Sequence, residues 1–139
     1  MKKYLKFLIL LIAFVFTFNL SSCNDKDETI EESVDYNLYI GTYEITSAKL
    51  GDVDVLDMFE SYTINLKEKR LYESIIKYTI DDEVIVEEGT YSISNDKITF
   101  KLPVDGGYTV ETYDILNNQI NMYGIINNVE MEIILKKVL

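Results

Sequence analysis

Apolar and polar residues alternate along most of the chain from residue 38 onward, and this alternation constrains its fold more than any other feature. Tyr62, Ile64 and Leu66, for example, alternate with Thr63 and Asn65. Because successive side chains of a β-strand point to opposite faces, the pattern predicts strands with one face in a core and the other in water. The many Ile, Val, Tyr, Thr and Phe residues suit such strands.

Short clusters of Asn, Asp and Gly separate these segments, and these residues tolerate the positive φ angles of tight hairpins. Sequential strands joined by short turns pair as an antiparallel meander. An open meander of this size would leave two long edges unpaired, so we expect an all-β, eight-stranded antiparallel up-and-down meander closed into a small barrel. The expected strands are residues 40–50, 61–67, 70–80, 83–94, 97–103, 108–116, 119–126 and 129–138.

Residues 51–60 form the one long connection between these strands. We expect a short helical turn at residues 56–59 that lies across one end of the barrel, with Val55, Met58 and Phe59 as a plug. The same segment has three aspartates but lacks the glycine and the terminal glutamate of an EF-hand loop. We interpret them as exposed loop carboxylates and predict no metal site: Asp52, Asp54 and Asp57.

Residues 1–22 have the layout of a secretory signal peptide. A basic start with three lysines precedes an unbroken apolar run over residues 7–16, and the small residues Ser21 and Ser22 end the segment. The apolar run is short for a membrane-spanning helix, which needs about 20 apolar residues. We therefore expect this segment to direct export.

Cys23, the only cysteine of the chain, follows directly. The run Leu20-Ser21-Ser22-Cys23 resembles a bacterial lipobox, in which the cysteine thiol receives a diacylglyceryl group and becomes the new N-terminus. A disulfide would have no partner within the chain. The resemblance implies lipidation at Cys23, and more than one acyl chain gives a stable membrane anchor.

The residues after Cys23 are mostly acidic. The run Asn24-Asp25-Lys26-Asp27-Glu28 resembles the lipoprotein export signal of the Bacteroidetes, which implies an outer-membrane protein displayed on the cell surface. A solvated tether is the other interpretation of the same run. Residues 23–37 bury too little apolar surface to order themselves, so we expect an acidic linker here and a barrel domain at residues 38–139.

The charge balance excludes some partners. Three of the 13 basic residues precede Cys23, so the chain from Cys23 onward has ten basic residues against 24 acidic ones, a net charge of −14. This charge argues against nucleic acid, whose phosphates need Lys and Arg. The chain has no histidine, the commonest catalytic base and metal ligand, and its only thiol is assigned to lipid. We therefore expect neither an enzyme nor a cofactor.

The domain resembles the small lipocalin-like domains of Bacteroidetes lipoproteins. Gly41-Thr42-Tyr43 opens the first strand, the long loop follows, and Gly89-Thr90-Tyr91-Ser92-Ile93 lies in mid-chain. Lipocalins proper have a tryptophan where this chain has Tyr43, and an arginine packs on it. In this chain Lys136 or Lys137 is the available cation.

Eleven tyrosines allow two interpretations of the barrel interior. They either fill the core or line a site for a small apolar ligand. We favour the ligand, gated by residues 51–60, with Tyr43, Phe59 and Tyr62 at the mouth. The alternative is a filled barrel that acts as an acidic inhibitor or accessory subunit for a basic protein partner. The expected ligand-binding residues are Tyr43, Phe59, Tyr62, Tyr78, Tyr91 and Phe100.

Cys23→Ser should abolish lipidation, because a hydroxyl does not replace the thiol as acceptor of the diacylglyceryl group. The variant should remain an unlipidated precursor, whereas the natural protein should have the mass of a cleaved, acylated chain. Intact-mass analysis distinguishes the two. An unmodified Cys23 in the natural protein would contradict the prediction.

Overall fold

The computed structural model describes residues 34–139. The predicted signal peptide at residues 1–22, the lipidation site Cys23 and the linker up to residue 33 lie outside the described residues.

The described chain forms nine strands and three short 3-10 helices. The helices are η1 (Tyr36–Leu38), η2 (Leu56–Met58) and η3 (Glu68–Arg70). The strands are β1 (Gly41–Leu50), β2 (Val53–Asp54), β3 (Phe59–Leu66), β4 (Leu71–Tyr78), β5 (Val84–Ser94), β6 (Lys97–Val104), β7 (Gly107–Leu116), β8 (Gln119–Ile126) and β9 (Val129–Lys137).

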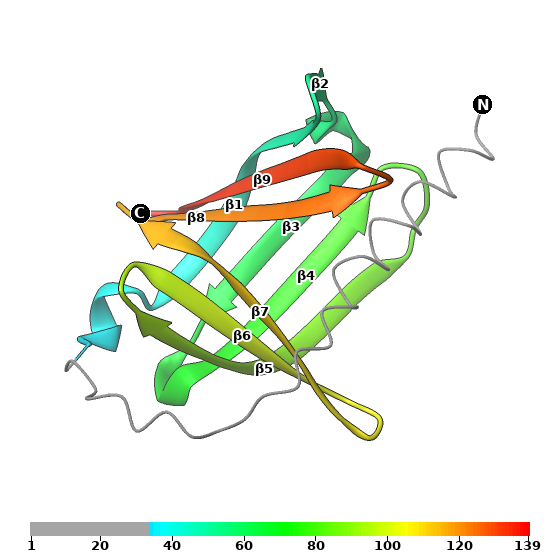
Figure 1. Ribbon diagram of the computed structural model, residues 1–139. Helices are drawn as coiled ribbons and strands as arrows, with labels where there is room; N and C mark the ends of the chain where they lie inside the picture. The colour runs from blue at the N-terminus through cyan, green and yellow to red at the C-terminus, as the bar shows by residue number, and fades with distance from the viewer. Residues whose placement is uncertain (1–33) are drawn as a thin grey trace.

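Eight of these strands close into an antiparallel barrel (Figure 1). β3 to β9 pair in sequence order, and β1 pairs with both β3 and β9. The two-residue strand β2 is an addition that pairs with the end of β1. The expected eight-stranded up-and-down barrel is confirmed, and each expected strand agrees with the observed one to within two residues at either end.

The hairpin turns have the backbone angles that their residues favour. Asn95-Asp96, Asn117-Asn118 and Asn127-Asn128 all have positive φ, between 48° and 64°. Asparagine and aspartate reach this region at little steric cost, and their turns match the right-handed twist of the flanking strands. These turns therefore set the register of three of the hairpins.

The inward faces of the strands form one apolar core. The residues that the alternation assigns to this face are all buried, as expected: Ile64, Tyr78, Tyr91, Ile98, Phe100, Ile133 and Leu135. Tyr43 and Leu66, toward the end of the barrel at which β1 begins, are almost completely buried.

η1 lies at that end, which we call the η1 end. Tyr36 packs against Tyr91 with ring centroids 5.9 Å apart, and the guanidinium of Arg70 lies 5.0 Å from the centroid of the Tyr36 ring. The Tyr36 hydroxyl also accepts a hydrogen bond from the Ile93 N–H. Tyr36, which the sequence assigns to the linker, therefore contacts the barrel.

η2 lies at the opposite end, which we call the η2 end. Val55, Met58 and Phe59 are buried in the core there, so the expected plug is confirmed. The Thr79 N–H donates to the Met58 carbonyl over 3.0 Å, which ties the plug to the end of β4.

The β6–β7 hairpin separates from both neighbouring strands toward the η2 end (Figure 1). The β5–β6 ladder ends at Thr90 and Lys101, and the part of β5 before Thr90 pairs only with β4. The β7–β8 ladder has three pairs, beginning at Asp114. Residues 102–104 of β6 and 107–113 of β7 therefore have ladder partners only within the β6–β7 hairpin.

Gly89→Ala should destabilise the barrel at the point where β5 leaves β6. An added Cβ would overlap the carbonyl oxygen of Lys101 and lie 2.8 Å from Cε1 of Tyr72. Overpacking of this kind costs about 1–3 kcal/mol of unfolding free energy, which urea unfolding measures.

Gly107→Ala is the matched control, since nothing lies within 4 Å of its added Cβ. The unfolding free energy of this variant should be within about 0.5 kcal/mol of that of the natural protein. Equal effects of the two substitutions would show that β5 does not approach β6 closely at Gly89.

Candidate functional site

Two glutamates point into the barrel between its centre and the η2 end. Glu87 on β5 pairs with Ser74 on β4, and Glu111 on β7 pairs with Phe100 on β6. Directly opposite residues of two strands share a face, and both Ser74 and Phe100 are buried. Glu88 lies on the outer face and is exposed, as expected for a neighbour of Glu87 on a strand.

Aromatic rings form two groups inside the barrel, one around Phe59 at the η2 end and one around Phe100 nearer the middle. Each group has a phenylalanine between two tyrosines, which places hydroxyl groups at its edges. The ring centroids lie 4.7–6.4 Å apart, Phe59 contacting Tyr62 and Tyr78, and Phe100 contacting Tyr72 and Tyr113.

Glu111 has one satisfied and one unsatisfied carboxylate oxygen. The Tyr113 hydroxyl donates to Oε2 over 2.8 Å. Oε1 is fully buried and has no hydrogen-bond partner among residues 34–139. Burial raises the pKa of Glu111 to about 7; the Tyr113 hydrogen bond opposes this rise and the charge of Glu87 adds to it.

The surrounding groups respond to the two carboxylates. Burial raises the pKa of Glu87 as well. Burial, followed by the charges of Glu87 and Glu111, raises the pKa values of Tyr62 and Tyr72. Burial, followed by the charge of Glu111, raises the pKa of Tyr113. The tyrosines are therefore neutral at physiological pH, and the two carboxylates act on the same part of the interior.

Solvent reaches this part of the interior. The inward side chains Ile76, Ile85, Leu102, Glu87 and Glu111 are only half-buried. In the half toward the η1 end, by contrast, the inward side chains are almost fully buried. The half-buried positions lie on β4 to β7, where the β6–β7 hairpin leaves its neighbours.

Three of the six predicted ligand-binding residues form the aromatic group at the η2 end, Phe59, Tyr62 and Tyr78. A fourth, Phe100, is opposite both Glu111 on β7 and Tyr91 on β5. Tyr43 and Tyr91 are buried toward the η1 end, where their hydroxyls donate to the carbonyls of Tyr39 and Lys67 over 2.9 and 3.1 Å.

The predicted grouping of Tyr43 with Phe59 and Tyr62 at one mouth is therefore wrong. Tyr43 is the third residue of β1 and its hydroxyl is held at the η1 end, whereas Phe59 begins β3 at the η2 end.

Lys137 is the cation that lies beside Tyr43. The two residues are directly opposite in the β1–β9 ladder, and Nζ of Lys137 donates to the Leu38 carbonyl over 3.1 Å. Lys136 is exposed. The ammonium group of Lys137 therefore binds the backbone at the η1 end and lies away from Glu87 and Glu111.

The ion pairs within residues 34–139 leave Glu87 and Glu111 without a basic partner. They join Lys67 to Glu73, Lys77 to Glu60 and Lys97 to Asp114. In the same part of the chain, no group of three or more acidic, histidine or cysteine side chains is placed to hold a metal ion.

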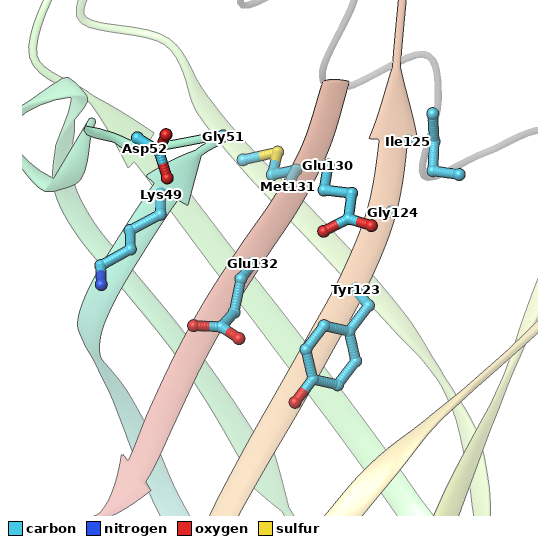
Figure 2. Close-up of a pocket in the computed structure, with 9 residues that line it drawn as sticks. All are labelled: Lys49, Gly51, Asp52, Tyr123, Gly124, Ile125, Glu130, Met131 and Glu132. Carbon is cyan, nitrogen blue, oxygen red and sulfur yellow. The ribbon is translucent and has the colours of Figure 1, made fainter. Parts of the chain in front are cut away.

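A pocket of about 660 Å³ lies on the outer wall of the barrel (Figure 2). On this wall Glu132 of β9 is opposite both Lys49 of β1 and Tyr123 of β8. The six predicted ligand-binding residues are not among its lining residues, which are Lys49, Gly51, Asp52, Tyr123, Gly124, Ile125, Glu130, Met131 and Glu132.

Sequence reasoning missed Glu111, the interior partner of Glu87. The signal was present in the alternation, because Glu111 is in register with Thr109, Tyr113 and Ile115, which are all buried. A charged residue in an inward register is unusual, since ionised side chains are costly to bury. Such a position is a candidate for function.

No protein-family model and no curated protein matches the chain. Several solved structures have a similar course of the chain, and the three described here have TM-scores of 0.42 to 0.44. Fatty-acid-binding protein 1 of Echinococcus granulosus is 8% identical, with a TM-score of 0.44 over 74% of this chain and 99% of that one.

A protein described as the REP1-NXSQ fatty acid transporter is 12% identical, with a TM-score of 0.43 over 72% of this chain and 96% of that one. A point mutant of the fluorescent protein UnaG is also 12% identical, with a TM-score of 0.42 over 74% of this chain and 98% of that one.

Glu111→Gln should change how stability depends on pH. The folded chain retains a proton on Glu111 between pH 4.5 and about 7 that the unfolded chain has released. The stability of the natural protein therefore falls as pH rises through this window. A glutamine side chain has no such proton, so the unfolding free energy of the variant should fall less steeply as pH rises. One pKa unit corresponds to about 1.4 kcal/mol, so at pH 8 the variant should be more stable than the natural protein by on the order of 2–3 kcal/mol.

Urea unfolding between pH 4 and 8 measures these slopes. Glu88→Gln serves as the control, because Glu88 is on the outer face and exposed. Identical slopes for the natural protein and Glu111→Gln would show that this carboxylate is hydrated in the folded state.

Proposed function

We propose that this protein is a lipid-anchored barrel that binds a small, largely apolar molecule without converting it. The observation that carries the proposal is the partial exposure of inward apolar side chains at Ile76, Ile85 and Leu102. Apolar surface in contact with water costs about 25 cal/mol per Å². A ligand that covered these side chains would recover that free energy.

The β6–β7 hairpin supplies the route of entry in this proposal. Residues 107–113 of β7 and residues 122–126 of β8 face each other without a shared ladder. In this proposal a small molecule enters between these segments, where no β7–β8 backbone hydrogen bond of the ladder has to break. This route replaces the loop at residues 51–60 as the entrance, because that loop is plugged by Val55 and Met58.

The location belongs to the same proposal. The lipobox Leu20-Ser21-Ser22-Cys23 and the acidic run after it support an outer-membrane anchor with the barrel outside the cell. No helix within residues 34–139 is long and apolar enough to span a membrane. Digestion of intact cells with an external protease tests the location, since a barrel that faces the periplasm would survive.

A protein partner is the second candidate. The pocket on the outer wall combines carboxylates, Glu130 and Glu132 among them, with the exposed side chains of Tyr123 and Ile125, which are 51% and 64% accessible. The lining has three carboxylates against one lysine, and exposed aromatic and aliphatic side chains beside such charge are features of protein-binding surfaces. A basic protein partner matches this charge.

Titration with a neutral fluorescent hydrophobic probe such as Nile red should show saturable binding at one site per chain. Ile85→Asp should weaken the binding at least tenfold, because it places a charge on the inner face.

Val86→Asp is the matched control. Val86 is the next residue, points outward and is 54% exposed, so its substitution should leave the affinity within about twofold. Equal losses in the two variants would place the probe on the outer wall, and absence of saturable binding would favour the protein partner.

A further inference from the structure

We propose that the ligand carries an ammonium or similar cationic head group, and that Glu87 and Glu111 bind this group inside the barrel. The inference rests on the proposed function, because it names the chemical class of the molecule that the same half of the barrel would hold.

The unsatisfied oxygen of Glu111 is the first observation. Oε1 exposes less than 1 Å² and has no donor within hydrogen-bond distance among residues 34–139. A buried acceptor without a partner costs about 1–3 kcal/mol, and most buried polar atoms in proteins have a partner. A ligand that donates a hydrogen bond would satisfy Oε1, whereas a purely apolar ligand would leave it unpaired.

The pairing of Glu111 with Glu87 determines the charge of that donor. Both carboxylates face the interior, and the charge of each acts on Tyr62, Tyr72 and Tyr113. Two carboxylates that share a site favour a cation, because each repels a second negative charge. The same repulsion opposes a ligand with a carboxylate head.

The basic side chains of the described chain do not supply this cation. Three lysines are paired with other carboxylates. Lys137 and Arg70 lie at the η1 end, on the Leu38 carbonyl and over the Tyr36 ring. No ion pair within residues 34–139 joins Glu87 or Glu111 to a lysine or arginine, and in this proposal the ligand supplies the cation.

The aromatic rings complete the site. The ring centroids of Tyr72 and Tyr113 lie 4.7 and 6.4 Å from that of Phe100. Phe100 is directly opposite Glu111, so the three rings lie beside this carboxylate. Aromatic faces attract ammonium groups, by roughly 2 kcal/mol where water is excluded. The rings that hold the apolar part of the ligand would thus also stabilise its charge.

Three ligands of equal chain length and different head group test the inference. Decylammonium, decanol and decanoate should be titrated by calorimetry into the full chain at pH 8, below their micelle concentrations. We expect decylammonium to bind at least tenfold more tightly than decanol, and decanoate to bind most weakly.

Two variants connect this preference to the carboxylates. Glu111→Gln and Glu87→Gln should each lower the affinity for decylammonium at least tenfold and change that for decanol by less than about threefold. Glu88→Gln, on the outer face, should change neither affinity.

The outcomes separate the inference from the proposed function. If decanol binds as tightly as decylammonium, or decanoate more tightly, the barrel binds apolar molecules but the cationic head group is wrong. If the two glutamine variants retain the preference for decylammonium, the ammonium group lies elsewhere and the inference is overturned. If none of the three ligands binds, both the inference and the proposed function fail.

Discussion

The pairing of β1 with β9 joins the first and last strands of the barrel and makes the other features possible. Its ladder runs from Tyr43 and Lys137 to Leu50 and Met131, with one irregularity between Ile45 and Ser47. Without it, both strands would expose unpaired backbone groups along their length. Closure also turns one face of every strand into a single interior, so that side chains from distant parts of the sequence meet there.

Closure is incomplete at the β6–β7 hairpin, and the polar residues of the interior lie beside this opening. Gly89 lets β5 pass close to Lys101 as the two strands separate. Glu87 lies two residues before Gly89, and Glu111 lies on the part of β7 that does not pair with β8. In the well-packed half toward the η1 end, a carboxylate would have no solvent contact and a far larger desolvation cost. The opening in the wall and the carboxylates inside it are thus parts of one arrangement.

Much of the fold followed from the sequence because its signals are local. Alternation determines strand faces, and pairs such as Asn117-Asn118 determine turns. The site could not be predicted from the sequence in the same way. Tyr43 and Phe59 lie near the starts of two antiparallel neighbouring strands, which places them at opposite ends of the barrel. The separation of β7 from β8 has no local signal, since both strands alternate normally on either side of the gap. No local signal connects Glu87 with Glu111, because Glu111 is 24 residues further along the chain, on the next strand but one.

The ionisation of Glu111 links stability to binding in the proposed complex. In the free protein, burial and the charge of Glu87 hold its pKa near physiological pH, at about 7, so the carboxyl is partly protonated. A bound ammonium group would favour the ionised form and lower this pKa. Binding would then release a proton, and the two carboxylates that destabilise the empty barrel would become the groups that hold the ligand. A barrel that is less stable empty than filled gains stability from its ligand by mass action, which gives a physical reason for a chain of this size to retain Glu87 and Glu111 where apolar residues would pack better.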